Sequence, residues 1–492
     1  MRPPPLIGAL LADAACYDHP VGKLELIETH ISWVILTGAY AYKIKKPVNL
    51  GFLDFSTLVQ RRQDCLDELR LNRRLATDYY LGVVSITGSS EAPRMNGAGE
   101  ILEYAVKMRQ FPVDATLDKL AERGELGNKP LDMLAARLAH FHLFECARAV
   151  DGSPWGEPEE IFRPVAENFK ILAARLDDPL TLQTLSLLQN WCLAEHTRLI
   201  PFMRARKKNG RVRECHGDLH LANLAWVDGG LVIFDCLEFS PALRWIDVIS
   251  EVAFCYMDLI HRQYERLASR FLNAWLEATG DYQGMALLRY YAVYRALVRA
   301  KVAALIENHA EVRRYLQLAQ QIASSTPVVL FITHGLSGSG KTTLSQQRLE
   351  TGGMIRLRSD VERKRCAGQD VLPDCGIEKG WYDPVMSQLT YEYLSRLAEE
   401  ILNSGWSVIV DAAFLERRQR DLFCDLARRL GVSFHILDFQ VSPAVLRERV
   451  ARRSAEGRDA SEANLSVLEH QLASARRLDA DETAWVQCEK SL

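Results

Sequence analysis

The sequence lacks several features that would assign it to a specialised class of protein. Its eleven cysteines include no C-x-x-C pair and no cluster with histidine at the spacing of a zinc site. No apolar run approaches the roughly 20 residues that span a bilayer, and 60 basic residues against 63 acidic ones leave a net charge of only -3. These absences exclude a zinc-cluster protein and a membrane-spanning protein, and they disfavour a general nucleic-acid binder. We expect a reduced, cytoplasmic chain that does not bind membranes.

What the sequence contains is typical of a globular chain with ordinary cores. Hydrophobic residues make up 48% of its 492 residues and charged residues 25%, which excludes global disorder. The length favours two or three folding units. The N-terminal segment MRPPPLIGALLADAAC carries only one basic residue, Arg2, and Asp13 interrupts its apolar stretch. We expect an ordinary first helix there rather than a secretion signal.

The first part of the chain, residues 1–324, combines a small mixed lobe with a helical lobe. Long helical patterns dominate from 131 to 318 and enclose a loop-rich, glycine-containing insert at 213–238. The mixed lobe fills 28–108, with strands expected at 30–38, 39–48 and 101–108 and a helix at 62–76. This organisation predicts an α+β domain.

A second domain is expected at 325–492. The segment AQQIASSTP at 319–327 ends a helical run in small and polar residues and a proline, and the apolar strand VVLFIT follows at once. Strands and helices then alternate, which predicts an α/β domain with a parallel sheet covered by helices on both faces. The expected elements are strands at 328–333, near Ile355, at 406–412 and at 432–439, with helices from Lys341, up to Asn403, at 416–430 and to the end of the chain.

The strongest motif is a phosphate-binding loop between the first strand and the first helix of this second domain. The segment GLSGSGKTT fits the pattern G-x-x-x-x-G-K-[ST]. Glycines let backbone N–H groups turn toward phosphates, Lys341 would meet the β- and γ-phosphates, and the Thr342 hydroxyl would hold Mg²⁺. The predicted nucleotide-binding residues are Gly335, Leu336, Ser337, Gly338, Ser339, Gly340, Lys341, Thr342 and Thr343.

Two carboxylates after neighbouring strands complete this predicted site. Asp411 ends the strand in WSVIVDAAF, where it would hold Mg²⁺ through water or orient a substrate. A helix N-cap is the alternative role for Asp411. Asp360 follows the strand in IRLRSDVERKR, where a carboxylate can accept a hydroxyl proton while Arg363 and Lys364 hold phosphate.

An arginine-rich segment, LRERVARRSAEGRDA, lies near the C-terminus of this domain. It predicts either a lid that closes over the transferred phosphate or a solvated helix face. Its cations are Arg447, Arg449, Arg452, Arg453 and Arg458.

Residues 325–492 resemble the P-loop kinase superfamily of small-molecule kinases, including its gluconate-kinase-like and zeta-toxin-like members. The resemblance rests on GLSGSGKTT, SDVERKR, VIVDAAF and the arginine-rich segment that ends in GRDASEA. It implies that Asp360 is the acid or base on the substrate side. It also implies that Arg449 and Arg453 belong to a lid over the nucleotide.

A second constellation lies in ECHGDLHLANLAWVDGGLVIFDCLEF. Asp218 stands five residues before Asn223, and Asp235 follows an apolar strand twelve residues later. In kinase chemistry one Asp accepts the substrate hydroxyl proton, an Asn binds a Mg²⁺, and a second Asp holds the Mg²⁺ that bridges the phosphates. The spacing predicts these roles for Asp218, Asn223 and Asp235 in that order.

This loop resembles that of the aminoglycoside phosphotransferase and choline kinase group, over about 25–310. The resemblance implies a protein-kinase-like bilobal fold in which a small-lobe lysine, paired with a helix glutamate, meets the phosphates. Lys43 and Lys45 share one strand face, and we prefer Lys43. Glu68 shares a helix face with two leucines and is the predicted partner, with an exposed glutamate as the alternative. Backbone near Met108 would meet the adenine.

The chain departs from that group in two ways that bear on how the first site would bind nucleotide. Only Gly38 stands where a G-x-G-x-x-G loop is expected, so binding of the triphosphate would be weak or would use other groups. In addition, Asp235 is followed by Cys and Leu rather than by Phe and Gly. We interpret Asp247 and Glu251 as scaffold. The basic stretch RARKKNGRVR at 204–213 would either recruit an acidic substrate or form a solvated loop.

These patterns and resemblances predict an ATP- and Mg²⁺-dependent phosphotransferase that moves the γ-phosphate to a hydroxyl of a small molecule. Each domain would carry a site, with Asp218 as the base of the first and Asp360 as its counterpart in the second. The alternative is a regulatory ATPase or nucleotide-gated binding protein with a degenerate kinase-like domain, which the missing glycine-rich loop favours. The sequence identifies neither the acceptor nor the oligomeric state.

Overall fold

The computed structural model describes residues 3–49, 53–368, 384–456 and 464–488. The chain divides into two compact units. Unit 1 comprises Met1–Pro130, His140–Pro164 and Met203–Cys255, and unit 2 comprises Leu131–Ala139, Val165–Phe202 and Tyr256–Leu492. The domain boundary between residues 324 and 325 stays a prediction, because these units group the helices that precede it with the segment that follows it.

The small lobe of unit 1 is a six-stranded antiparallel sheet with the order β1-β2-β3-β6-β4-β5. Three of the strands lie at the ranges expected from the sequence, whereas β4, which pairs with β6 along its length, was not foreseen. The strands are β1 (Glu25–Glu28), β2 (Ser32–Leu36), β3 (Tyr40–Lys45), β4 (Tyr80–Gly88), β5 (Pro93–Met95) and β6 (Ile101–Arg109). Strand β3 therefore lies inside the sheet, with β2 on one side and β6 on the other.

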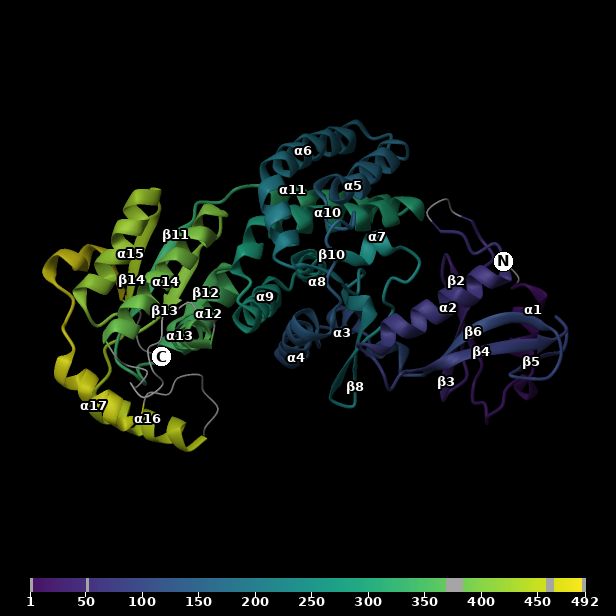
Figure 1. The fold of residues 1–492 in the computed structure, drawn as a ribbon, viewed down its shortest axis with the longest axis horizontal. Coiled ribbons are helices and arrows are strands. Elements are labelled where there is room, and N and C mark those ends of the chain that lie inside the picture. Colours follow the sequence, from purple (N-terminus) through teal and green to yellow (C-terminus); the bar gives the residue numbers. More distant parts are fainter. Residues whose placement is uncertain (1–2, 50–52, 369–383, 457–463, 489–492) are drawn as a thin grey trace. The chain divides into compact units, whose positions relative to one another are not determined.

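Helix α2 (Leu58–Arg73) packs on this sheet against β4 and β6 (Figure 1). It begins with a capping box, in which Thr57 Oγ1 accepts from the Gln60 N–H and Gln60 Oε1 accepts from the Thr57 N–H. Its inner face buries Glu68 together with apolar residues. The helix thus brings the carboxylates of Asp64 and Glu68 to the sheet.

The rest of unit 1 includes the second predicted loop. Two short hairpin-like pairs, β8 with β9 and β10 with β7, frame residues 212–247. The elements are α1 (Pro5–Ala12), α3 (Leu117–Glu122), α4 (Asn128–His140), α5 (Pro158–Ala173), α6 (Pro179–Lys208), β7 (Val212–Glu214), β8 (Leu224–Val227), β9 (Gly230–Ile233), α7 (Pro241–Arg244), β10 (Trp245–Asp247) and α8 (Val248–His261).

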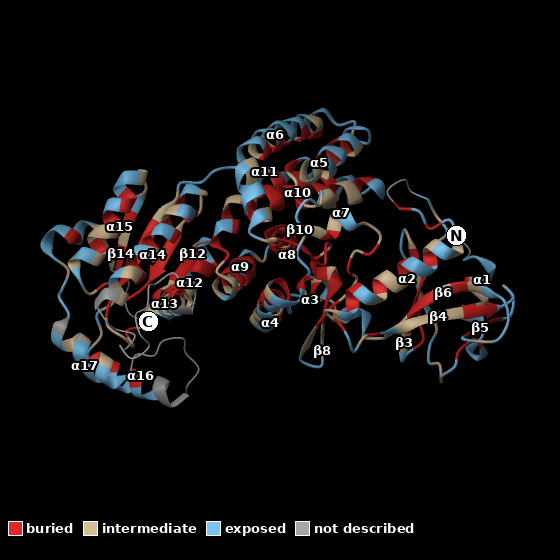
Figure 2. Cartoon of the chain, viewed as in Figure 1, coloured by how far each residue is buried: buried red, intermediate tan, exposed pale blue. Residues whose placement is uncertain are grey.

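Unit 2 contains the predicted parallel sheet, with the order β12-β13-β11-β14-β15. Its strands are buried beneath helices whose outer faces are exposed (Figure 2). The elements are α9 (Glu265–Thr279), α10 (Met285–Leu305), α11 (His309–Ala323), β11 (Val329–His334), α12 (Lys341–Gly352), β12 (Ile355–Arg358), α13 (Ser359–Gly368), α14 (Pro384–Asn403), β13 (Val408–Asp411), α15 (Arg417–Leu430), β14 (Ser433–Asp438), α16 (Pro443–Glu456), α17 (Leu465–Ser474) and β15 (Val486–Cys488). The order reverses direction at β11, and a ligand site is expected at the carboxyl ends of the strands there.

The expectation of helices up to the C-terminus is wrong, because β15 adds a fifth strand beside β14. A buried ion pair explains the difference. Arg420 of α15 and Glu482 are 2% and 1% exposed and form two hydrogen bonds of 2.6 and 2.8 Å. This pair holds the chain next to the sheet, and the residues after Trp485 can then pair with the open edge of β14. Three residues are too few for a strand pattern to be visible in the sequence.

No helix among the described residues is long and apolar enough to cross a membrane. Nine of the cysteines, all of them buried, are free thiols.

Replacing Glu482 by Ala tests the buried pair at the end of the chain. The substitution leaves the Arg420 guanidinium buried without its partner, which typically costs about 3–5 kcal/mol. We expect a correspondingly lower urea midpoint for unit 2 in denaturation followed by circular dichroism. Asp481→Ala is the control, because Asp481 pairs with Arg417 at the surface, and it should leave the midpoint almost unchanged. Equal effects of the two substitutions would contradict this account.

Candidate active sites

Lys43 connects two carboxylates of the first predicted site. Its Nζ lies 2.9 Å from Glu68 Oε1 and 2.5 Å from Asp235 Oδ1. The Glu68 side chain is fully buried and that of Asp235 is 42% exposed. The alternative of an exposed Glu68 is therefore wrong. The lysine of β3, the glutamate of α2 and the aspartate after β9 come together as a kinase-like site requires.

Lys45, on the same face of β3, has a different environment. Its Nζ lies 2.8 Å from Asp64 Oδ2 and 2.5 Å from Glu68 Oε2, and it also bonds Glu238 Oε1. The Lys45 side chain has no exposed surface. It is thus enclosed by carboxylates, whereas Lys43 is the lysine that contacts Asp235.

This cluster sets unusual protonation equilibria. Burial opposes the ionisation of Glu68, but the two lysines lower its pKa to about 2. Burial raises the pKa of Glu238 to about 8, and the Glu68 carboxylate adds to this shift while Lys45 opposes it. Burial disfavours both ammonium groups, yet the surrounding carboxylates raise the pKa values of Lys43 and Lys45 well above 10.5. The carboxylates keep both lysines charged at neutral pH, while burial favours the protonated form of Glu238.

Asp218 and Asn223 face each other across one turn of the predicted loop. The Asn223 side-chain amide donates to the backbone oxygen of Asp218 at 2.9 Å and to its Oδ2 at 3.2 Å. His220 Nε2 lies 3.4 Å from the same carboxylate oxygen. Because the Asn223 N–H groups are directed to Asp218, its carbonyl oxygen is oriented for another partner, and oxygen donors are the ligands that Mg²⁺ prefers.

Two buried groups hold this loop in place. Glu251 Oε2 accepts hydrogen bonds from the backbone N–H groups of His216 and Gly217 at 2.7 and 3.3 Å, and Oε1 lies 3.3 Å from His142 Nε2. Burial opposes the ionisation of Glu251, but these partners lower its pKa to about 2. His216 Nδ1 accepts from the Asp218 N–H, so its Nε2 is the donor to the Phe234 carbonyl at 2.8 Å. Glu251 and His216 therefore fix Asp218 relative to the segment that carries Asp235.

Asp235 has a strained backbone that its neighbours stabilise. Its φ of 64° lies in the left-handed region, which is uncommon for a residue other than glycine. Its N–H donates to the Tyr80 hydroxyl at 3.1 Å, and the next N–H, of Cys236, donates to Asn72 Oδ1 at 2.8 Å. Helix α2 and strand β4 thus help to position Asp235, and strain of this kind is concentrated at functional sites.

Met108 belongs to an apolar cluster shared by β6, α2 and the β8–β9 pair. The cluster includes Val106, Ala225 and Val232, and the rings of Phe111 and Phe234 are 5.0 Å apart. This surrounding is compatible with the predicted adenine position, which stays a prediction.

The segment that would correspond to a glycine-rich loop is a tight turn. Strands β1 and β2 are joined by three residues, and the turn is closed because the Thr29 N–H donates to the Ser32 carbonyl at 2.9 Å. The Thr29 hydroxyl accepts from the Ser32 N–H at 2.9 Å. In the next turn, Gln110 Oε1 accepts from the N–H groups of Thr37 and Gly38. Neither turn carries the G-x-G-x-x-G pattern of a glycine-rich loop.

The phosphate loop of unit 2 joins β11 to α12, as the sequence predicts. Gly338 has a φ of 81°, and a Cβ atom there would lie 3.2 Å from the Leu446 carbonyl oxygen, so the position requires glycine. Lys341 Nζ donates to the carbonyl oxygens of Gly335 and Leu336 at 2.9 and 2.7 Å. The loop is folded around its own lysine, with the N-terminus of α12 at its end.

Asp411 lies at the end of β13 and contacts α12. The Ser345 hydroxyl, one turn after Thr342, lies 3.1 Å from Asp411 Oδ2. Helix α15 begins only after Glu416, so Asp411 is not its N-cap. Asp360 lies in the first turn of α13 and pairs with Arg363 at 3.3 Å. Thr342 and Asp411 are oxygen donors on adjoining elements, a set that fits Mg²⁺.

The arginine-rich segment divides into cations with different partners. Arg449 of α16 donates to the Gly338 carbonyl at 3.4 Å, which places a cation at the phosphate loop. Arg447 pairs with Glu469 at the surface, which matches the solvated alternative. The side chain of Arg453 and the whole of Arg458 lie outside the described residues.

The basic stretch at 204–213 is in part structural. Arg206 forms two bonds of 2.6 and 2.7 Å with Asp247, and both side chains are buried. Lys207 lies 2.6 Å from Glu157. These contacts agree with the interpretation of Asp247 as scaffold.

Several residues of these sites were not singled out in the sequence. Asp64 precedes Glu68 by one helical turn, which is a signal that could have been read, and Ser345 follows Thr342 at the spacing of one turn. Glu238 and Arg356 carry no local signal, because their partners are distant in the sequence.

Glu251→Gln tests how the buried carboxylate supports the loop. A pKa of about 2 against the ordinary 4.5 corresponds to about 3 kcal/mol of stabilisation. Because the folded-state pKa is lowered, this stabilisation is present above pH 4.5 and is lost as the pH falls toward 2. In urea denaturation, the stability difference between the natural chain and the variant should therefore shrink between pH 5 and pH 3. Glu100→Gln, at an exposed position, should produce no difference at any pH. A difference for Glu251→Gln that does not change with pH would contradict the assignment.

Two family models match the chain, over segments that include Asp218, Asn223 and Asp235 and the phosphate loop but not Lys43 or Glu68. The model described as "Phosphotransferase enzyme family" matches residues 121–288, and the model described as "AAA domain" matches residues 330–478. They bear out the expectation of a kinase-like fold followed by a P-loop domain with a parallel sheet. They also support phosphotransferase activity and nucleotide binding at a general level.

Solved structures with similar folds cover one part of the chain each. A choline/ethanolamine kinase family protein from Mesorhizobium loti is 10% identical, covers 63% of this chain and 90% of its own, and has a TM-score of 0.40. A sugar kinase from Janibacter is 21% identical, covers 33% of this chain and 85% of its own, and has a TM-score of 0.25. With these scores, the two likenesses support no statement about activity.

Relatives of the full length are found in mycobacteria. The proteins named "Uncharacterized protein Rv2004c" from Mycobacterium tuberculosis and "Uncharacterized protein Mb2027c" from Mycobacterium bovis are each 31% identical over 471 residues. The similarity covers 91% of this chain and 91% of each relative. Because it extends over both matched segments, the chain belongs to the same family as these two-segment mycobacterial proteins.

Proposed function

We propose that the chain is an ATP- and Mg²⁺-dependent phosphotransferase that moves the γ-phosphate of ATP to a hydroxyl of a small molecule. The observation that carries the proposal is the position of Lys43, which bridges Glu68 and Asp235 in the unit that also holds the Asp218–Asn223 pair. These are the side chains that phosphoryl transfer needs, namely a lysine for phosphates, carboxylate and amide oxygens for metal, and a carboxylate base.

In the first site, each residue has a role that follows from its contacts. Asp218, whose side chain is 35% exposed, would accept the proton of the acceptor hydroxyl as its oxygen bonds to the γ-phosphorus and the bond from that phosphorus to the leaving ADP oxygen breaks. Asn223 and Asp235 would hold Mg²⁺, which neutralises charge on the phosphates when bound. Lys43 would hold phosphate oxygens while Glu68 fixes its position.

In the second site, the phosphate loop would bind a second nucleotide. Lys341 would exchange the carbonyl oxygens of its own loop for β- and γ-phosphate oxygens, which are charged and therefore stronger acceptors. Thr342 and Asp411 would hold Mg²⁺, and Arg449, already at the loop, would contact the transferred phosphate. Asp360 would be the base for an acceptor in this site.

The tight turn between β1 and β2 favours a second candidate function. With a three-residue turn in place of a glycine-rich loop over the triphosphate, unit 1 would bind nucleotide weakly and sense it, and the phosphate loop alone would consume ATP. ATP hydrolysis that does not depend on any acceptor would support this regulatory ATPase, whereas acceptor-dependent turnover supports the phosphotransferase.

The number of nucleotide sites distinguishes these functions. We expect calorimetric titration with a non-hydrolysable ATP analogue and Mg²⁺ to give two sites per chain. Lys341→Ala should remove one of them, because the loop loses the lysine that would bind the β- and γ-phosphates. Asp218→Asn should preserve both sites but, when combined with Lys341→Ala, should abolish the remaining transfer from radiolabelled ATP to a panel of hydroxylated acceptors. A single site that disappears with Lys341→Ala would refute a kinase site in unit 1.

The two lysines of β3 should differ in their effects. Lys43→Met should lower kcat of the first site by about 10²- to 10³-fold, the typical effect of removing one transition-state donor. Its loss of stability should be smaller than that of Lys45→Met, because Lys45 still pairs with Glu68 and the 42% exposed Asp235 can be solvated. Lys45→Met should leave three buried carboxylates without their common cation and lower the free energy of unfolding by about 3–5 kcal/mol. For both variants, steady-state kinetics measures kcat and urea denaturation measures the free energy of unfolding. The reverse pattern would assign the phosphate contact to Lys45.

A further inference from the structure

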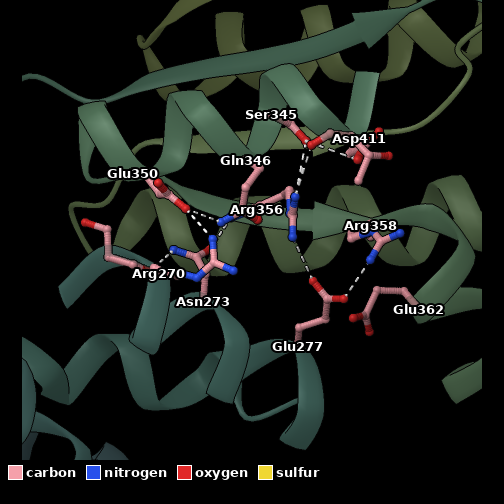
Figure 3. A network of polar contacts seen from close by, with 12 residues as sticks. Arg270, Asn273, Glu277, Ser345, Gln346, Glu350, Arg356, Arg358, Glu362 and Asp411 are labelled. Atoms are coloured by element: carbon pink, nitrogen blue, oxygen red, sulfur yellow. Dashed lines mark hydrogen bonds and ion pairs between the residues drawn. The ribbon is translucent and has the colours of Figure 1, made fainter. Parts of the chain in front are cut away.

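Helix α9 precedes the phosphate-loop segment by more than fifty residues, yet it packs along α12, the helix that follows the loop. Side chains of α9 point toward both α12 and β12 (Figure 3). Asn273 of α9 donates to the Met354 carbonyl at 2.9 Å and accepts from the Arg356 N–H at 2.8 Å. The Asn273 side chain therefore joins α9 to backbone groups at the start of β12.

At the far end of α12, α9 binds a buried glutamate. Arg266 and Arg270 each donate to Glu350 at 2.7 Å, and Gln346 does so from within α12. Glu350 is five residues beyond Ser345 and shows no contact with the phosphate loop or with Asp411. This contact fastens the two helices together without touching the nucleotide site.

At the near end, Glu277 of α9 reaches toward the nucleotide site through arginines of β12. Its two carboxylate oxygens lie 3.2 Å from Arg356 Nη2 and 2.9 Å from Arg358 Nη1. Arg356 Nη1 in turn lies 3.4 Å from the Thr342 carbonyl and 3.5 Å from the Ser345 hydroxyl. Figure 3 shows this chain of contacts, which ends at Asp411.

The contacts of Arg356 favour one of the two acceptors that the Ser345 hydroxyl can donate to. The Ser345 hydroxyl has one proton and two acceptors within 3.1 Å, the Thr342 carbonyl and Asp411 Oδ2. Because Arg356 also donates to the Thr342 carbonyl, it competes for that acceptor and favours donation from Ser345 to Asp411. Glu277 keeps Arg356 in this position and neutralises its charge close to the predicted metal site.

We propose that Glu277 is a positioning residue for the phosphate-loop site, which acts through Arg356 and Ser345 to orient Asp411 and to keep its surroundings favourable to Mg²⁺. The inference rests on the proposed nucleotide and Mg²⁺ binding by this loop. Helix α9 lies outside the segment matched as an AAA domain, and the proposal gives its residue Glu277 a positioning role in that site.

Glu277→Gln tests the proposal against Glu350→Gln as a matched control, because both variants remove a carboxylate that arginines bind at the same pair of helices. The measurement is the binding of a non-hydrolysable ATP analogue as a function of MgCl₂ concentration, restricted to the binding that Lys341→Ala removes. We expect Glu277→Gln to raise the half-saturating Mg²⁺ concentration by about tenfold, because an uncompensated guanidinium repels the metal at this range. Glu350→Gln should leave it within about twofold, even where both variants lower the melting temperature.

Arg356→Lys gives a second route to the same answer if Glu277→Gln folds poorly. It keeps a cation in place but removes the planar group that connects Glu277 to the Thr342 carbonyl, and it should raise the Mg²⁺ requirement in the same direction. Equal Mg²⁺ requirements for Glu277→Gln and Glu350→Gln would overturn the positioning role. Failure of the proposed function would look different, since the natural chain itself would then show no binding that depends on Lys341.

Discussion

A carboxylate that is removed from water needs a cation or hydrogen-bond donors, and this requirement organises both candidate sites. Glu68 is held by two lysines, and Glu251 by two backbone N–H groups and a histidine. In each case the partner is a group that phosphoryl transfer needs in a fixed place, either the lysine of β3 or the start of the loop that carries Asp218. The same contacts therefore stabilise the buried carboxylate and position the group that phosphoryl transfer would use.

The two sites meet this requirement in different ways. In unit 1, side chains from a sheet, a helix and a loop form a network of ions, so the geometry depends on tertiary packing. In the phosphate loop, glycines and a helix N-terminus supply the geometry from the backbone, and Lys341 donates to carbonyl oxygens of the loop itself. Anchoring to α9 through Asn273 and Glu277 adds to the second site the tertiary support that its local motif lacks.

The parts of these sites that could be predicted are those encoded at short range. The phosphate loop and the spacing of Asp218, Asn223 and Asp235 are local patterns, and the alternation of β3 and the periodicity of α2 indicated the Lys43–Glu68 pair. Contacts that form only through tertiary packing have no such local pattern in the sequence. Glu277 and Arg356 are 79 residues apart, and strand β15 is too short to show a period, since a buried ion pair rather than local propensity determines its position.

Lys43 bridges one carboxylate that is buried and one that is open to solvent, and this asymmetry suits a phosphate-binding lysine. If Lys43 left Glu68, a fully buried carboxylate would lose one of its two cations, whereas Asp235, 42% exposed, can be solvated or can bind a metal ion instead. Exchange of partners is therefore least costly at Asp235. The ammonium group has three N–H donors, so Lys43 can stay on Glu68 while the donor now directed to Asp235 turns to a phosphate oxygen. The left-handed backbone of Asp235, held by Tyr80, keeps that carboxylate in place during the exchange.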